Sequence, residues 1–127
     1  MVFRNANLFD SQTGQSRPGT TVVVSGNRIQ AVGPDGSVQV PAGAQVIDAA
    51  GKALLPGLFD MHVHLGQVDG LFHLASGVTS VRDLANDTTV FPQVAAEWNA
   101  GTRVGPRVLV MAGFIDGSGP FAAPTGL

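Results

Sequence analysis

The stretch that decides the fold is LPGLFDMHVHL, which spans residues 55–65. Apolar side chains occupy both faces of this segment, as Leu58, Phe59 and Val63 illustrate. Such a run is typical of a strand covered on both faces in a parallel α/β sheet, whereas a half-exposed strand alternates apolar and polar residues. We therefore expect a buried strand over residues 58–65.

Two histidines in this strand are candidate metal ligands. Side chains alternate faces along a strand, so His62 and His64 should point the same way, with Asp60 on the same face. Two neutral imidazoles on a rigid element provide half of a first-row metal site, in which histidine is the commonest ligand. A His-x-His pair also occurs by chance, but a buried pair without partners would be costly. The pattern therefore favours metal binding.

The residues before Pro56 predict a small β-rich region. Short β-prone runs are separated by turn signals, and Ser25-Gly26-Asn27 between two apolar runs is typical of a hairpin. Pro34-Asp35-Gly36 is a second turn. The strands expected here are 20–25, 28–32, 45–49 and 53–55. We interpret residues 1–55 as a β-meander with these additional short strands.

After Pro56, strand-like and helix-like runs alternate. Apolar residues from Val90 to Trp98 recur at helical spacing, Pro92 fits only a first helical turn, and Gly101 suits a helix C-terminus. The expected strands are 58–65, 78–84 and 107–114, and the expected helices are 70–76 and 88–100. This alternation predicts parallel βαβ units, and hence the α/β class.

Composition limits the function classes. The 127 residues are 44% hydrophobic and 13% charged, which is ample for a packed core. The net charge is −2 and the seven basic residues are scattered singly, so neither a nucleic-acid nor a membrane partner is expected. The absence of cysteine excludes disulfides and thiolate zinc sites. No targeting segment or membrane span is evident, so cytoplasm is the default expectation.

The tail from Ile115 to Leu127 is rich in Gly, Pro and Ala, and we expect a loop there. Three parallel strands would leave an open sheet edge with a hydrophobic strand, which favours aggregation unless it is covered. We therefore expect the fold to be truncated and the natural chain to continue past Leu127.

Three blocks of this sequence resemble the N-terminal portion of the amidohydrolase superfamily, in its imidazolonepropionase-like and prolidase-like branch. The first is VVVSGNRIQAVG at 22–33, and the second is VIDAAGKALLPGLFDMHVH at 46–64. The third combines GVTSVRD at 77–83 with GPRVL at 105–109 and AGF at 112–114. The middle block is the specific one.

The resemblance implies a two-part architecture. Residues 1–55 would be the N-terminal part of a small β-sandwich domain. Residues 56–127 would be the first three strands and two helices of an incomplete (β/α)8 TIM barrel. His62 and His64 would then lie at the C-terminal mouth of the barrel, where TIM-barrel active sites are found.

The resemblance also implies a metal-dependent hydrolase. His62 and His64 would hold a divalent metal, zinc in the first place, as one or two ions. Metal-bound water with a pKa lowered to about 7 would attack the C–N bond of an amide, a cyclic amide or a dipeptide. The expected partner is therefore a small-molecule substrate, and the oligomeric state is left open.

The chain departs from the family pattern in the rest of the site. Family members add a lysine, two further histidines and an aspartate from later strands, whereas this chain has Lys52 upstream of the pair and His73 on a predicted helix. Asp60 and Asp83 are candidates to line the site, although Asp83 equally suits a cap or a partner of Arg82. The other carboxylates after the pair are Asp69, Asp87, Glu97 and Asp116, the last expected in a turn.

Two ligands do not suffice, because catalytic metal sites normally use three protein ligands and a water. The catalytic residues are therefore expected beyond residue 127, and the 127-residue chain alone is expected to bind metal weakly and to be inactive. The alternatives are a degenerate amidohydrolase or another non-catalytic protein with a binding role, a stand-alone β-rich module, and a deaminase of the same superfamily. A cupin is disfavoured because no glutamate follows the histidines at the required short distance.

Overall fold

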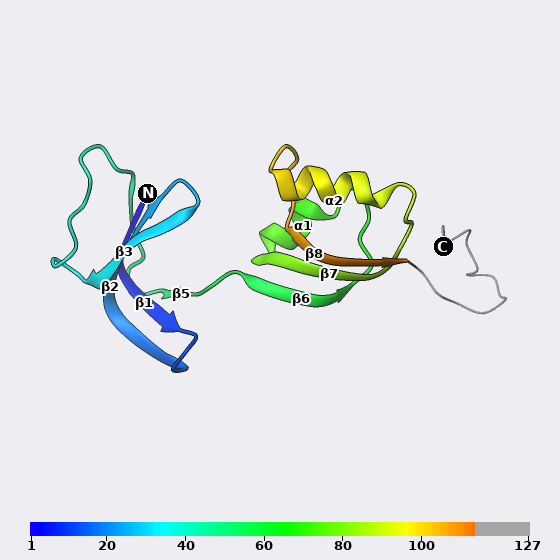
Figure 1. Ribbon diagram of the computed structural model, residues 1–127. Helices are drawn as coiled ribbons and strands as arrows, with labels where there is room; N and C mark the ends of the chain where they lie inside the picture. The colour runs from blue at the N-terminus through cyan, green and yellow to red at the C-terminus, as the bar shows by residue number, and fades with distance from the viewer. Residues whose placement is uncertain (114–127) are drawn as a thin grey trace. The chain divides into compact units, whose positions relative to one another are not determined.

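The computed structural model describes residues 1–113 (Figure 1). The chain divides into two compact units, one ending at Pro56 and the other beginning at Gly57. Each unit has its own sheet and is described separately. Asp116 and the tail predicted as a loop lie outside the described residues.

The first unit is a five-stranded sheet in the order β3-β2-β1-β4, with β5 also paired to β1. Strands β1 (Val2–Asp10), β2 (Gln15–Ser25) and β3 (Arg28–Pro34) are antiparallel neighbours, which confirms a meander for this part. Strands β4 (Val46–Asp48) and β5 (Ala53–Leu54) instead pair in parallel with β1. They are the two additional short strands expected at 45–49 and 53–55, whereas their parallel pairing with β1 was not predicted.

Local chemistry explains the turns of this unit. Ser25 pairs with Arg28, so the predicted hairpin has a two-residue loop, and Gly26 adopts the φ of +57° that such a loop needs. Strand β1 was not predicted as an element. Its ladder with β2 is irregular between Phe3 and Ala6, where Asn5 has a φ of +53° and interrupts the alternation of side chains.

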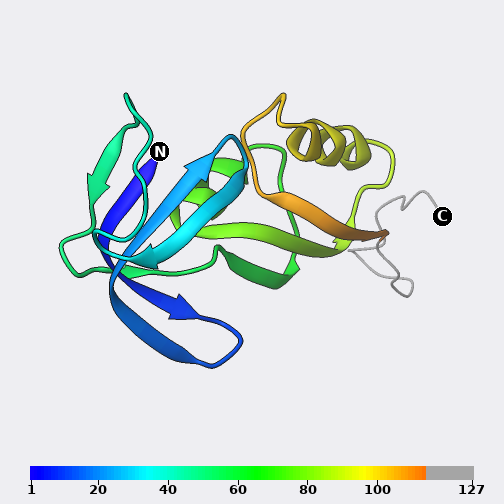
Figure 2. The same ribbon diagram turned by 60° about the vertical axis from the view of Figure 1, so that its left-hand side comes forward.

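The second unit is a parallel three-stranded sheet with two helices, as predicted. The strands β6 (Leu58–Val63), β7 (Val78–Asn86) and β8 (Arg107–Gly113) are in sequence order. The helices α1 (Gly70–Ala75) and α2 (Phe91–Ala100) lie on the same side of this sheet (Figures 1 and 2). No helix within residues 1–113 is long and apolar enough to cross a membrane.

Helix α2 begins three residues later than predicted but uses the predicted signals. Pro92 lies in its first turn, and Gly101 ends it in the left-handed conformation with a φ of +71°. Val90 was expected on the buried face, but it is 44% exposed, and Phe91 is buried in its place. The reason is the late start, because residues 87–90 form a turn in which Asp87 accepts bonds from Thr89.

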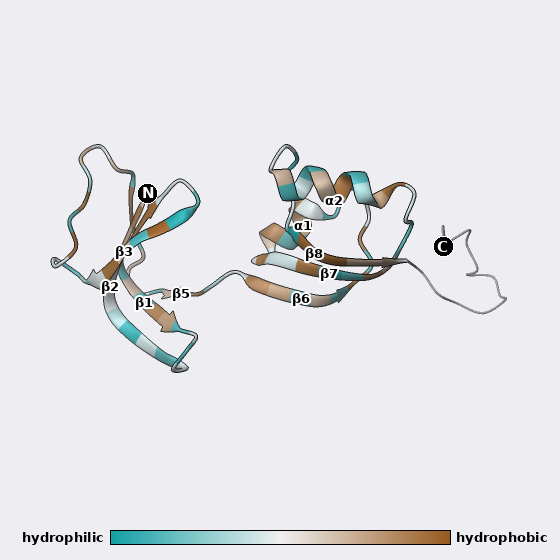
Figure 3. Cartoon of the chain, viewed as in Figure 1, coloured by the Kyte–Doolittle hydropathy of each residue, from teal (hydrophilic) through white to brown (hydrophobic). Residues whose placement is uncertain are grey.

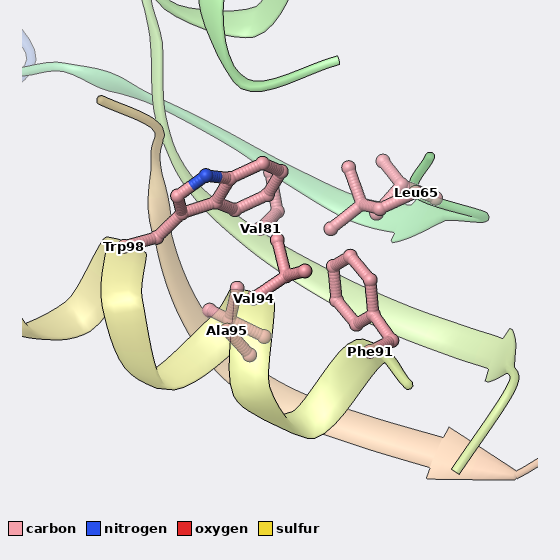
Figure 4. Packing of buried hydrophobic residues seen from close by; sticks show 8 residues of the cluster. Leu65, Val81, Phe91, Val94, Ala95 and Trp98 are labelled. Carbon is pink, nitrogen blue, oxygen red and sulfur yellow. The ribbon is translucent and has the colours of Figure 1, made fainter. Parts of the chain in front are cut away.

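The hydrophobic core of the second unit lies between α2 and the sheet (Figure 4). The rings of Phe91 and Trp98 meet edge to face, with centroids 5.7 Å apart. Apolar residues run along β8 and alternate with polar ones along α2 (Figure 3). The buried members of the core are Val63, Leu65, Val81, Phe91, Val94, Ala95, Trp98 and Val108.

The prediction that β6 is buried on both faces is wrong for the strand as far as His62. Leu58 is 51% exposed and Phe59 is 62% exposed, whereas Val63 and Leu65 are buried. The core beneath helix α2 includes Val63, Leu65, Val81 and Val108 of the sheet, whereas the side chains at the beginning of β6 are exposed.

Candidate metal centre

His62 and His64 lie side by side at the C-terminal end of β6. Their ring centroids are 5.2 Å apart, and the rings are nearly perpendicular at 80°. Both side chains are exposed, whereas the intervening Val63 is buried in the core. The alternation of the strand therefore presents the two imidazoles together on the face that the core does not use.

The separation of the rings suits a shared ion. A metal about 2.0–2.1 Å from one nitrogen of each ring lies about 3.2 Å from each ring centre, so tetrahedral ligands have centres about 5 Å apart. The centroid distance of 5.2 Å between His62 and His64 matches this value. Two neutral imidazoles are also the donors that a first-row divalent metal prefers.

One nitrogen of His64 has a defined partner. Its Nδ1 lies 3.2 Å from the carbonyl oxygen of Ala85, at the end of β7. A carbonyl can only accept a hydrogen bond, so a hydrogen bond here requires the proton on Nδ1, and a neutral imidazole in that form carries its lone pair on Nε2. This is the arrangement of metal-binding histidines, which donate the second ring N–H to a backbone or carboxylate oxygen.

Asp60 is half-buried on β6 and faces its own backbone. Its Oδ1 accepts a hydrogen bond from the His62 N–H at 3.2 Å. The ladder between β6 and β7 is irregular between Asp60 and Val63, and the carbonyl of Met61 in this interval accepts a bond from Arg82 Nε at 2.8 Å. Asp60 thus holds the backbone of His62. Arg82 binds the carbonyl of the preceding residue, Met61, where the pairing of β6 with β7 is irregular.

Asp83 is completely buried on β7 and pairs with Val63 in the ladder. It receives hydrogen bonds from the backbone N–H groups of Leu65, at 3.0 Å, and Ala85, at 3.1 Å. Arg82 points elsewhere, so the two side chains are not partners. Asn86, which the sequence did not single out, donates from Nδ2 to Asp83 at 2.5 Å and to the carbonyl of Leu65 at 2.8 Å.

The other candidate residues take ordinary positions. His73 is half-buried on α1, and Asp69 accepts the N–H of Gly66 at 2.7 Å just before that helix. The hydroxyl and N–H of Thr89 lower the pKa of Asp87. Within residues 1–113, no three His, Asp or Glu side chains converge to hold a metal. Within this part of the chain, His62 and His64 are therefore a pair of neighbouring imidazoles without a third such ligand beside them.

Sequence comparison finds enzymes of two kinds. Adenine deaminase 3 of Rhizobium meliloti is 37% identical over 65 residues, which are 51% of this chain and 11% of that protein. The imidazolonepropionase of Anaeromyxobacter dehalogenans is 43% identical over 72 residues, covering 51% of this chain and 17% of that protein. The matches thus span a small part of these relatives. No protein-family model matches the sequence.

Structural comparison covers nearly the whole chain. A prolidase-like protein of Bifidobacterium longum superposes with a TM-score of 0.86 at 26% identity, over 98% of this chain and 33% of that protein. Molinate hydrolase gives a TM-score of 0.81 at 25% identity, over 90% and 30% of the two chains. Phenylurea hydrolase B gives 0.74 at 30% identity, over 96% and 32%. The chain corresponds to about a third of each of these structures.

Proposed function

We propose that this chain, which belongs to the amidohydrolase superfamily, contributes the first two metal ligands of an enzyme that hydrolyses a carbon–nitrogen bond. The observation that carries this proposal is the His62–His64 pair, with its rings 5.2 Å apart at the end of a parallel strand. In this proposal, the second unit begins a (β/α)8 barrel, and the first unit is part of a β-sandwich domain.

The pair supports the chemistry of hydrolysis. His64 offers Nε2 because its Nδ1 is engaged by Ala85, and His62 lies beside it on the same face. Bound there, a divalent metal such as zinc would supply an activated water at neutral pH and polarise the bond under attack. Asp60 and Asp83 keep the two histidines in place through the backbone, which is the role we propose for them. The third ligand and the general base would come from outside residues 1–113.

Two substrate classes are compatible with the relatives. The structural neighbours favour an amide or dipeptide bond, because they include a prolidase-like protein, molinate hydrolase and phenylurea hydrolase B. Deamination of a purine-like amine is the second candidate, and adenine deaminases from several bacteria favour it. On a longer natural protein that contains this sequence, ammonia released from adenine would separate deamination from cleavage of a dipeptide or urea.

Metal binding is testable on the chain itself. We expect Co²⁺ or Zn²⁺ to bind weakly at a single site, and His62→Ala and His64→Ala each to abolish that binding in calorimetry and in Co²⁺ absorption spectra. His73→Ala is the matched control, because it removes an imidazole from α1 and should leave binding unchanged. Absent binding in the unaltered chain, or equal losses in all three variants, would refute the proposed site.

A further inference from the structure

Asp83 is a buried carboxylate that faces only hydrogen-bond donors. It has no exposed surface, and each of its oxygens accepts at least one N–H group: Oδ2 from Leu65 and from Asn86, and Oδ1 from Ala85. Burying an ionised carboxylate is costly unless it is fully hydrogen-bonded. Hydrogen bonds to a charged acceptor are also among the strong ones. The carboxylate therefore fixes the groups that it contacts.

These contacts fix the backbone groups on either side of the His64 hydrogen bond. Leu65 directly follows His64, and its N–H is held by Asp83 while its carbonyl is held by Asn86. Ala85 provides the carbonyl that faces His64 Nδ1, and its own N–H is held by the other oxygen of Asp83. One side chain thus holds both ends of the His64–Ala85 hydrogen bond, the backbone beside the imidazole and the peptide beside its acceptor.

We propose that Asp83, with Asn86, is the positioning residue that keeps His64 in its Nδ1–H tautomer and so presents Nε2 to a metal. The imidazole of a free histidine in water prefers the opposite tautomer, with the proton on Nε2. The carbonyl of Ala85 reverses that preference only if it stays within hydrogen-bond distance of Nδ1. Asp83 maintains this distance across two strands, whereas no hydrogen bond within residues 1–113 holds the ring of His62 in this way.

The benefit of this tautomer for metal binding rests on the proposed function, but the tautomer itself is a property of the metal-free chain. A purely structural Asp83 would stabilise the end of β7 without affecting the imidazole. A positioning Asp83 predicts a change at His64 alone. The tautomer of His64 distinguishes the two roles, because no global property of the fold reports it.

The experiment uses ¹⁵N-labelled 127-residue chain at a pH of about 8.5, two units above the usual histidine pKa, so that the imidazoles are neutral. Long-range ¹H–¹⁵N spectra identify the tautomer of each histidine, and the His64→Ala variant assigns the His64 signals. We expect His64 in the Nδ1–H form and His62 with a larger share of the Nε2–H form. Zn²⁺ affinity is measured by calorimetry on the same samples.

Asp83→Asn is the main variant, because an amide has one acceptor oxygen and must turn its NH₂ group towards Leu65 or Ala85. We expect the His64 signals to shift towards the Nε2–H form and the Zn²⁺ affinity to fall about 10- to 100-fold. Asn86→Ala removes the bonds to the Leu65 carbonyl and to Asp83 Oδ2 but leaves the carboxylate with the N–H groups of Leu65 and Ala85, so it should give a smaller change of the same sign. It also provides a measurement if Asp83→Asn does not fold.

Asp87→Asn is the matched control, since it removes the same charge from an exposed carboxylate four residues further on. It should leave the His64 tautomer unchanged. The inference is overturned if His64 keeps the Nδ1–H form in a folded Asp83→Asn or Asn86→Ala variant, or if Asp87→Asn shifts it equally. If the tautomers behave as expected but the unaltered chain binds no Zn²⁺, the positioning role stands and the proposed function fails.

Discussion

Replacing Gly105 by alanine is expected to destabilise the second unit, because Trp98 fills the space beside Gly105. A β-carbon added at Gly105 would lie 2.4 Å from Cδ2, 2.5 Å from Cγ and 2.6 Å from Cε2 of the indole ring. Contacts under 3.0 Å force one of the two groups to move. The ring has little room to move, because it is 4% exposed, meets Phe91 edge to face, and has its Cζ2 2.9 Å from the β-carbon position of Gly70.

The size of the effect follows from overpacking. Inserting one methyl group into a close-packed core costs about 1–3 kcal/mol, and the Gly105→Ala variant belongs in this range. The indole Nε1 is buried and has no hydrogen-bond partner within residues 1–113, so packing alone holds the ring. For a unit of this size, the loss corresponds to a decrease in Tm of about 5–20 °C.

Trp98 is the single tryptophan of the chain, so its fluorescence reports unfolding of the second unit directly. The decisive control is a double-mutant cycle with Trp98→Leu, followed by circular dichroism. Removing the ring provides room for the added methyl group, so Gly105→Ala should be nearly neutral in that background, with a coupling energy of at least about 1 kcal/mol. A loss below about 0.5 kcal/mol in the unaltered background, or the same loss in both backgrounds, would refute the packing argument.

Two further predictions concern one unit each. Phe91→Ala should destabilise the second unit by about 3–5 kcal/mol, and Phe91→Leu by much less, since leucine preserves most of the buried volume. If chemical denaturation gave similar losses of unfolding free energy for the two variants, the packing seen between Phe91 and Trp98 would be contradicted. In the first unit, the Thr21 hydroxyl and the Asn5 N–H lower the pKa of Asp35 from its usual range. The ionised form of Asp35 therefore adds stability that is fully present above the unfolded pKa and is lost as the pH falls through the folded pKa. Asp35→Asn should therefore be less stable than the unaltered chain at pH 7, and the difference should shrink in urea unfolding below a pH of about 4; a pH-independent difference would exclude this linkage.

The parts of the fold that were predictable depend on neighbouring residues. Pro92 and Gly101 mark the first turn and the end of α2 through their own backbone preferences, and the Gly26-Asn27 loop fixes the hairpin in the same way. The parallel pairing of β4 and β5 with β1 was not predictable, since the partners lie about 45 residues apart in sequence, as Val2 and Val46 illustrate. Strand β1 was missed because Asn5 breaks the period of two on which strand prediction relies.

The candidate site also has a part that depends on neighbouring residues, which could be predicted, and a part that depends on distant residues, which could not. His62 and His64 could be found because their spacing and the period of a strand already place them on one face. The positioning role we propose for Asp83 could not be found in this way, since the sequence equally allowed it to line the site, to cap a helix or to pair with Arg82. Only the register that places Val63 opposite Asp83 brings the carboxylate to the N–H of Leu65. The sequence thus identifies groups able to bind a metal, whereas the pairing of the strands determines which ring nitrogen of His64 is free to do so.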